Sequence, residues 1–380
     1  MINITDKHNC CGCNACGDIC PKQAISFKFD NEGFWYPEVD MQKCIDCGMC
    51  EKVCPCLNVK EAKQPIRVFA AINPNEGIRM TSSSGGVFWM LVERIIGDGG
   101  VVFGAAFDNE WMVCHSSAES LGEAKEFRGS KYVQSRVNGC YKQVQDALKQ
   151  GRKVLFSGTA CQISALKEYI RKDYDNLFTV DVVCHGVPSP GIWNDYIKTL
   201  ASSKTIKSIN FRDKRTGWRN YVFSVQFSDG SELKESHNKN LYMIGFLHDL
   251  YLRPSCHSCK FKACSCGSDI TLGDFWGIEK LVPEIDDNRG VSIVLINTPK
   301  GEEIIKALEL SFIEVEYELA IKGNLCISIA TPEPKWRTEF MERYEGKDGL
   351  KAISIIVKTL RSSLIERIKC KFKCLCMKLY

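Results

Sequence analysis

Cysteine is the most distinctive reactive residue of this sequence, and eight of the 22 cysteines repeat one spacing near the N-terminus. Each repeat reads C-x2-C-x2-C-x3-C-P, and the second begins 34 residues after the first. Three thiolates on a tight loop, with a fourth set apart beside a proline, suit a polynuclear metal cluster. The candidate ligands are Cys10, Cys13, Cys16, Cys20, Cys44, Cys47, Cys50 and Cys54.

This spacing is typical of bacterial two-cluster ferredoxins, in which the fourth cysteine of each run binds the other cluster. Zinc fits less well, because zinc sites favour separated C-x2-C pairs and often include histidine. We therefore predict two 4Fe–4S clusters, with Cys11 and Cys56 as neighbours that bind no iron. The first set is Cys10, Cys13, Cys16 and Cys54, and the second is Cys44, Cys47, Cys50 and Cys20.

Four further cysteines could serve another metal centre. Cys161 and Cys184 each follow an expected strand, and Cys256 and Cys259 form a C-x2-C pair. Because neighbouring strand ends converge in an α/β sheet, a third cluster could collect all four. A buried core role for single cysteines is one alternative. A local zinc group is another, formed by Cys256, Cys259, Cys264 and Cys266, and the spacing alone leaves these alternatives open.

The elements that must position these residues alternate between strands and helices after a polar linker at 60–65. Strands are expected at 67–72, 101–106, 153–156 and 178–183. Helices are expected at 87–96 and, after a loop at 157–162, up to about residue 170. Ser- and Gly-rich loops follow some of these strands, and the free N–H groups of a helix start can bind an anion such as a pyrophosphate. No G-x-G-x-x-G follows a strand and no P-loop motif occurs, so a standard Rossmann or P-loop site is not supported.

Several short segments, taken together, resemble the beta subunit family of coenzyme F420 hydrogenase and dehydrogenase, in the form with a fused ferredoxin domain. They follow the order of that family across roughly residues 1–300. Ala160 departs from it, because the family usually has proline there, and the insert from Cys264 to Cys266 is also atypical. The matching segments are 83–87, 129–135, 156–162, 181–189, 211–214, 217–218, 253–260 and 269–277.

The resemblance implies an FAD-binding α/β domain of non-Rossmann type with a third 4Fe–4S cluster beside the flavin. On that basis Cys161, Cys184, Cys256 and Cys259 are favoured as the ligands of the third cluster. Lys131 would lie near the flavin or its phosphates and His185 is a candidate proton donor, against the alternatives of a surface lysine and a structural histidine. The FAD cradle would include Ser83, Ser84, Gly85 and Gly86.

The implied function is that of an iron–sulfur flavoprotein oxidoreductase. Electrons would pass between the ferredoxin clusters and FAD, which exchanges hydride with coenzyme F420 or another two-electron substrate. A redox partner protein or ferredoxin is then expected as the one-electron partner. The alternatives are a non-catalytic electron-transfer subunit, a reductase of surface-polysaccharide biosynthesis and a zinc-stabilised interaction module.

The expected fold class is α+β and α/β, with a two-cluster ferredoxin domain at residues 1–60. A non-Rossmann flavin domain follows in two parts, at 66–150 and 151–330. A helical basic tail is expected at 331–380. The length of 380 residues is enough for two or three domains with real cores.

The charge is concentrated in the tail, where residues 351–380 carry eight Lys or Arg and one Glu. That segment has a net charge of +7 against +4 for the whole chain, which leaves residues 1–350 at −3. An acidic body without a reading motif excludes nucleic acid as a partner. The tail fits either a docking helix or peripheral contact with the inner membrane surface. Without a signal peptide or a long apolar run, a cytoplasmic location is expected.

Overall fold

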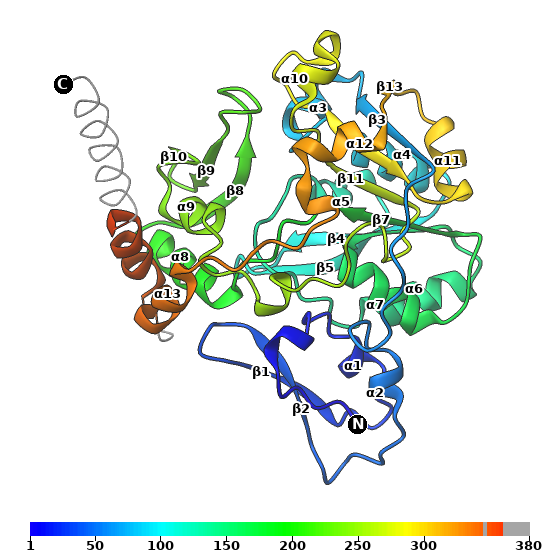
Figure 1. Cartoon of the computed structure of the whole chain (residues 1–380), viewed down its shortest axis with the longest axis vertical. Helices are drawn as coiled ribbons and strands as arrows, with labels where there is room; N and C mark the ends of the chain where they lie inside the picture. The colour runs from blue at the N-terminus through cyan, green and yellow to red at the C-terminus, as the bar shows by residue number, and fades with distance from the viewer. Residues whose placement is uncertain (345–347, 360–380) are drawn as a thin grey trace, which may run out of the picture.

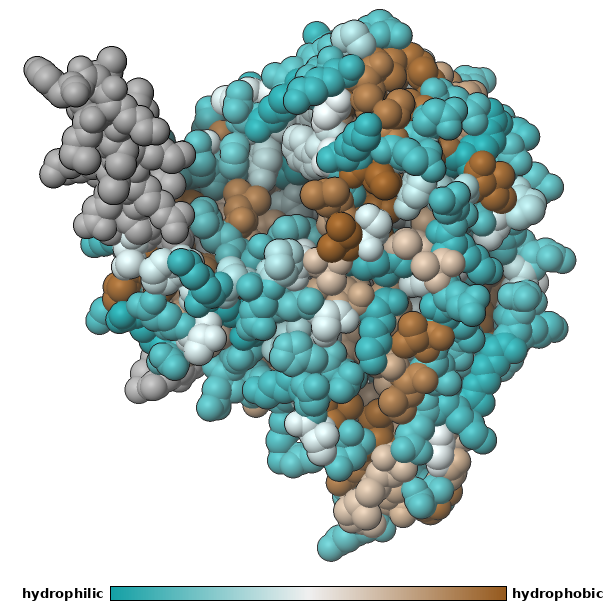
Figure 2. Space-filling view, viewed as in Figure 1, coloured by the Kyte–Doolittle hydropathy of each residue, from teal (hydrophilic) through white to brown (hydrophobic). Residues whose placement is uncertain are grey.

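The computed structural model describes residues 1–344 and 348–359 of the chain. Figure 1 shows three parts: an N-terminal module (residues 1–60) at the bottom, a central sheet with its helices, and a smaller sheet beside it. None of the helices in this described part has the length and apolar character needed to cross a membrane. Figure 2 shows the hydrophilic and hydrophobic side chains on the same face of the molecule.

The N-terminal module has the same local structure in its two cysteine repeats. The one-turn helix α1 (Ala15–Asp18) follows Asn14 at φ 66°, and α2 (Met49–Lys52) follows Gly48 at φ 69°, the equivalent position 34 residues later. A left-handed residue there turns the chain tightly between the second and third cysteines of each run. The strands β1 (Ile25–Phe29) and β2 (Trp35–Val39) form an antiparallel hairpin between the two repeats.

The central part is built on one mixed sheet of eight strands in the order β13-β3-β12-β11-β7-β6-β4-β5. β4, β6, β7 and β11 are parallel, and β3 runs in the same direction because β12 is antiparallel to both β11 and β3. The strands are β3 (Arg67–Ile72), β4 (Val101–Phe107), β5 (Val113–Ala118), β6 (Val154–Thr159), β7 (Leu177–Val182), β11 (Ile270–Asp274), β12 (Ser292–Ile296) and β13 (Ser311–Glu314).

Alternating side chains of these strands enter separate cores on the two faces of the sheet. Val102 and Leu155 pack with α4 and α11, whereas Val101 and Phe156 pack with α6 and α7. The N-terminal module extends the second of these cores through buried residues such as Cys11 and Val53. The helices are α3 (Glu76–Thr81), α4 (Val87–Gly97), α5 (Leu121–Ala124), α6 (Cys140–Lys149), α7 (Ala160–Ile170), α10 (Ile278–Leu281), α11 (Pro299–Lys306) and α12 (Tyr317–Ala320).

A long insert (residues 183–269) separates β7 from β11 and carries a core of its own. Figure 1 shows its three-stranded sheet beside the central sheet. The helix α13 (Trp336–Tyr344) and the helical residues 349–359 pack on the core of the insert, which includes Ile353 and Ile356. The elements of the insert are α8 (Pro190–Ala201), β8 (Ile206–Asp213), β9 (Val222–Phe227), β10 (Glu232–Ser236) and α9 (Leu241–Leu247).

The expected strands and helices of the central part are confirmed, with ends that differ by a few residues. Strands from both parts of the expected domain, 66–150 and 151–330, pair side by side in one sheet. In the expected tail, the helical residues 349–359 pack on the core of the insert, as a docking helix would. The rest of that prediction, including Cys370, Cys374 and Cys376, lies outside the described residues.

Candidate iron–sulfur and flavin sites

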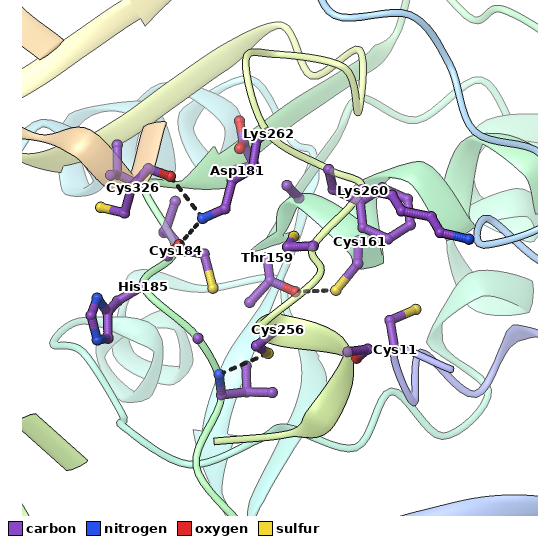
Figure 3. Close-up of a pocket in the computed structure, with 18 of the residues that line it drawn as sticks. Cys11, Thr159, Cys161, Asp181, Cys184, His185, Cys256, Lys260, Lys262 and Cys326 are labelled. Atoms are coloured by element: carbon purple, nitrogen blue, oxygen red, sulfur yellow. Dashed lines mark hydrogen bonds between the residues drawn. The ribbon is translucent and has the colours of Figure 1, made fainter. Parts of the chain in front are cut away.

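A cavity lies where the carboxyl ends of β6 and β7 meet the end of the insert and the N-terminal module. This cavity will be called the cysteine cavity, because eight thiols line it. Figure 3 shows Cys161, Cys184 and Cys256 around its centre, with Cys11 on one side and Cys326 on the other. The lining cysteines are Cys11, Cys56, Cys161, Cys184, Cys256, Cys259, Cys264 and Cys326.

The four cysteines favoured for a third cluster are electrostatic neighbours in this cavity. The thiol of Cys184 interacts with those of Cys256, Cys161 and Cys259. Burial raises the pKa of the Cys256 thiol to about 12, and it raises those of Cys184 and Cys259 as well. Buried neutral thiols become thiolates readily only when a metal takes the proton's place. The donor set therefore fits an iron–sulfur cluster.

The cysteines of the rival local group have different nearest partners, although Cys264 also lines the cavity. Cys264 hydrogen-bonds with Thr271, and Cys266 lies against Ser268, with the carboxylate of Asp181 near both thiols. Cys256 and Cys259 have Cys161 as a further neighbour instead. Among residues 1–344 and 348–359, no three His, Cys, Asp or Glu side chains converge on a position for one metal ion. A cubane cluster spreads its four thiolates over four iron atoms, so it needs no such convergence.

The second expected ferredoxin set surrounds a cavity of its own. Its lining includes Cys20, Cys44, Cys47 and Cys50, and Cys47 is exposed at the surface. Backbone N–H groups donate to three of these sulfurs: Ile2 to Cys50 at 3.2 Å, Ala24 to Cys20 at 3.3 Å and Asp46 to Cys44 at 3.4 Å. Such N–H donors stabilise cluster-bound sulfur and tune its reduction potential.

The first expected set lies deeper, between the second set and the cysteine cavity. The thiol of Cys16 interacts with Cys13 and Cys10 of its own set and with Cys50 of the second. Cys13 in turn is a neighbour of Cys54, so all four members of the first set lie together.

Cys11 and Cys56 were expected to bind no metal, and the structure places both in the lining of the cysteine cavity. The Cys11 thiol hydrogen-bonds with Cys13 of the first set and with Cys161 of the cavity. Cys11 therefore spans the short distance between two expected clusters. Nothing in the spacing could reveal this, because Cys161 is 150 residues away in the sequence.

The residues expected to cradle FAD lie in two loops that contact each other. Ser83 Oγ accepts a hydrogen bond from the N–H of Ser130 at 2.7 Å, which joins loop 83–86 to the loop that carries Lys131. Ser84 Oγ donates to the carbonyl of Val291 at 2.8 Å. A Cβ on Gly85 would lie 2.4 Å from the carbonyl oxygen of Ala71, so this glycine lets the loop pack on β3.

Lys131 is half-buried beside this loop and lies outside the lining of the cysteine cavity. Its Nζ donates to the carbonyl of Gly129 at 3.1 Å and lies 5.9 Å from the centre of the Phe107 ring. Burial lowers the pKa of Lys131 to about 8. Its ammonium therefore loses its proton at a lower pH than that of an ordinary lysine.

Arg212, in the matching segment 211–214, is a buried cation to which the sequence assigned no role. Its Nη1 donates to Asp274 Oδ2 at 2.7 Å and to the Tyr132 hydroxyl at 3.1 Å, and its guanidinium lies 4.1 Å over the ring of Tyr221. Its Nε and Nη2 are buried and have no hydrogen-bond partner among the residues that the structure describes. Because a buried donor without an acceptor is costly, an acceptor of a bound molecule fits this position. Tyr132 follows Lys131 directly, which links Arg212 to the expected flavin residues.

His185 lines the cysteine cavity, directly after Cys184. Its Nε2 lies 2.5 Å from Asp249 Oδ1, and its ring packs edge-on against Phe246. The carboxylate fixes the orientation of the imidazole and favours a proton on Nε2. The side chain of this histidine is 42% exposed.

Comparison with known proteins finds a family match for the N-terminal module and for the part of the chain from β6 to β13. Residues 9–58 match the 4Fe-4S dicluster domain, and residues 151–318 match the family described as the C terminus of the coenzyme F420 hydrogenase/dehydrogenase beta subunit. The two domains define an iron–sulfur protein of an oxidoreductase family. Residues 151–318 therefore form a domain of the coenzyme F420 hydrogenase/dehydrogenase beta subunit type.

Individual relatives agree with this assignment. The chain is 24% identical over 332 residues to the coenzyme F420-dependent sulfite reductase of Methanocaldococcus jannaschii, an alignment that covers 82% of this chain and 47% of the relative. An uncharacterized ferredoxin of the same organism is 36% identical over 52 residues, 14% of this chain and 66% of that protein. The chain thus spans about half the length of the sulfite reductase that it matches.

One solved structure aligns with most of the chain. It belongs to the F420-reducing NiFe hydrogenase complex from Methanosarcina barkeri. The alignment covers 78% of this chain and 93% of the other, with a TM-score of 0.45 at 18% identity.

Proposed function

We propose that the protein is a flavin- and iron–sulfur-dependent oxidoreductase that passes electrons between a one-electron carrier and a two-electron substrate. The observation that carries the proposal is the cysteine cavity, which brings Cys161, Cys184, Cys256 and Cys259 together directly beside the N-terminal module. These four cysteines are proposed to hold a third 4Fe–4S cluster. The match to the beta subunit family favours coenzyme F420 as the substrate class.

The three cysteine sets form a path from the surface to the central sheet. The second set includes the exposed Cys47, which makes it the entry point for a redox protein. The first set lies between it and the cysteine cavity, with Cys16 beside Cys50 on one side and Cys11 reaching Cys161 on the other. When bound, the clusters supply one-electron steps and FAD supplies the conversion to hydride chemistry.

The flavin is proposed to bind at the loops 83–86 and 129–131. Its support is the pair of buried Arg212 donors, Nε and Nη2, that require an acceptor. Lys131 adds a cation that attracts the phosphates, and Ser83 fixes the two loops against each other. In the neighbouring cavity, His185 is proposed to hold or release a proton while Asp249 holds its ring in place.

The cofactor content of protein purified without oxygen tests this proposal. Wild type should contain about twelve iron atoms and about one FAD per chain, because three cubane clusters hold four irons each. Cys184→Ser should lose about four of these irons and keep the spectral signals of the N-terminal clusters. Cys266→Ser, a change at a cysteine outside the proposed set, should keep all of them.

Two results would contradict the proposal. About eight irons without flavin would leave a ferredoxin-type electron carrier. Iron loss in Cys266→Ser but not in Cys184→Ser would assign the third centre to the local group. With cofactors in place, reduced coenzyme F420 should bleach the clusters anaerobically, and bound flavin without any such bleaching would indicate a different substrate or a non-catalytic subunit.

A further inference from the structure

A fully buried arginine joins the N-terminal module to the insert. Arg253 lies three residues before Cys256. Its side chain is fully buried and contacts the loop of the first cysteine repeat. Nε donates to the carbonyl of Cys10 at 2.7 Å, and Nη2 donates to the carbonyl of Trp35 at 3.1 Å. Nη2 also lies 3.5 Å from the sulfur of Cys10, and Nη1 donates to Gln134 Oε1 at 3.1 Å.

The same contacts fix the cysteine loop from several sides. Gln134 Nε2 donates to the carbonyl of Cys11 at 3.0 Å, and the indole of Trp35 donates to that of Gly12 at 3.0 Å. A Cβ on Gly12 would lie 2.7 Å from Nη1 of Arg253, so the loop and the guanidinium pack without space between them. The guanidinium therefore has a defined position relative to the Cys10 sulfur.

Arg253 has no carboxylate to balance its charge within the described part of the chain. Its partners there are carbonyls, one amide and one thiol, and its guanidinium lies 4.3 Å over the ring of Tyr36. Burying an unpaired charge is expensive, because the charge loses its hydration. A cluster bound by four thiolates carries net negative charge, and Cys10 would place that charge against Arg253.

We propose that Arg253 is the buried counter-charge of the first cluster and holds its reduction potential above that of the second. A cation and an N–H donor at a ligand sulfur both favour the reduced, more negative form. An electron that enters at the second cluster would then move on to the first, which lies beside the cysteine cavity. This step transfers one electron and neither makes nor breaks a bond.

Around the second cluster, the described residues include no equivalent buried cation. Its cavity is lined by Lys22 and the Met1 ammonium, but both are exposed to water. The Met1 ammonium also forms an ion pair with Glu51 at 3.0 Å. Solvent and salt screen such charges, so they affect a cluster potential far less than Arg253 does.

The proposal rests on Cys10 as a ligand of the first cluster, and it does not require the flavin or the third cluster. The test is a redox titration of the full-length holoprotein, followed by electron paramagnetic resonance. In Arg253→Gln one of the two N-terminal clusters should show a lower midpoint potential, while the other stays at the wild-type value. Arg253→Lys, which keeps the charge, should restore most of the difference.

A second variant tests the charge without removing the arginine. Gln134→Glu places a carboxylate of the same size where Oε1 accepts from Nη1 of Arg253, so it should lower the same midpoint potential. Arg136→Met is the matched control, because Arg136 lies over the ring of Trp35 at the same interface and is not a partner of Cys10 among the described residues. This control should leave both potentials unchanged, and iron analysis verifies that each variant holds its clusters.

The outcomes separate clearly. Equal potentials in wild type, Arg253→Gln and Gln134→Glu would overturn the proposal. So would a shift of the same size in Arg136→Met, or an equal shift of both clusters, because each would indicate a general loss of structure. A wild-type protein without flavin would contradict the proposed oxidoreductase but would leave this measurement intact.

Discussion

At the scale of single residues, the charge of Lys131 is the property most open to experiment. Burial lowers its pKa to about 8, so the ammonium that faces the proposed flavin site is protonated at neutral pH and loses its proton as the pH rises. An anionic cofactor favours the protonated form. Affinity for FAD should therefore be highest below pH about 8 and fall above it.

Lys131→Met should weaken FAD binding roughly tenfold at neutral pH, which is the loss of one charge-assisted hydrogen bond. It should also remove the fall in affinity between about pH 7 and about pH 9, because no titrating charge remains. Fluorescence titration of flavin-free protein with FAD measures both effects. Lys125→Met, a change at an exposed lysine nearby, should behave as wild type, and a wild-type affinity that is independent of pH would place Lys131 outside the flavin site.

Residues differ in how far the sequence could predict their role. Eight ferredoxin cysteines were predictable because their ligand geometry is set by local spacing, and the dicluster match agrees with them. Arg253 and Arg212 were not, because their roles depend on neighbours far away in the chain: Arg253 contacts Cys10, and Arg212 contacts Tyr132. Neither contact leaves a periodicity or a spacing that can be recognised in the sequence.

At the scale of elements, the start of helix α4 shows how a loop is fitted against a sheet. Gly85 packs on the backbone of β3 and β12, and Gly86 begins the helix at φ 84°. The helix itself was predictable from its run of apolar residues. The close approach of its first turn to β12 was not, because the contact joins residues 207 positions apart in the chain.

Alanine substitutions should rank these glycines by cost. Gly139 begins α6 at φ 75°, and no atom of the described residues lies within 4 Å of an added Cβ, so Gly139→Ala should cost only backbone strain, about 1 kcal/mol. Gly86→Ala adds a contact at 3.0 Å to Asn73 and should cost about 2 kcal/mol. Gly85→Ala forces a Cβ against two backbones and should cost about 3 kcal/mol or more.

Urea unfolding followed by circular dichroism measures the ranking. An equal loss of stability in Gly85→Ala and Gly139→Ala would contradict the packing of the loop on β12. FAD affinity provides a second readout, since only changes in loop 83–86 should alter it.

At the scale of the whole molecule, the tip of the β1–β2 hairpin is held by two distant segments. Arg337 on α13 donates to the Glu32 carboxylate at 2.5 Å and to the carbonyl of Leu252 at 3.1 Å. Ser189 Oγ donates to the carbonyl of Glu32 at 2.6 Å, and Gly191 donates to that of Gly33 at 3.0 Å. The insert and α13 thus fix the module against the cysteine cavity.

Arg337→Met should loosen this attachment by about 2 kcal/mol, because it breaks a largely buried ion pair and leaves Glu32 unpaired. The exposed linker at 60–65 should then be cut by protease roughly tenfold faster, since local opening frees its backbone from the hydrogen bond that the Lys63 N–H donates to the carbonyl of Ala263. Arg343→Met is the control on the same helix, because its exposed pair with Glu339 contributes little. Equal cleavage rates in the two variants would show that the hairpin tip does not hold the module.

The long insert between β7 and β11 has a consequence for how the protein is made. The eight N-terminal cysteines lie between Cys10 and Cys54 and can capture iron while the rest of the chain is still being synthesised. The cysteine cavity instead needs Cys161, Cys184 and Cys256 together, which requires the whole insert to fold between them. Loading of the proposed third cluster should therefore follow that of the N-terminal clusters, and cells short of iron should accumulate protein that holds only the N-terminal clusters.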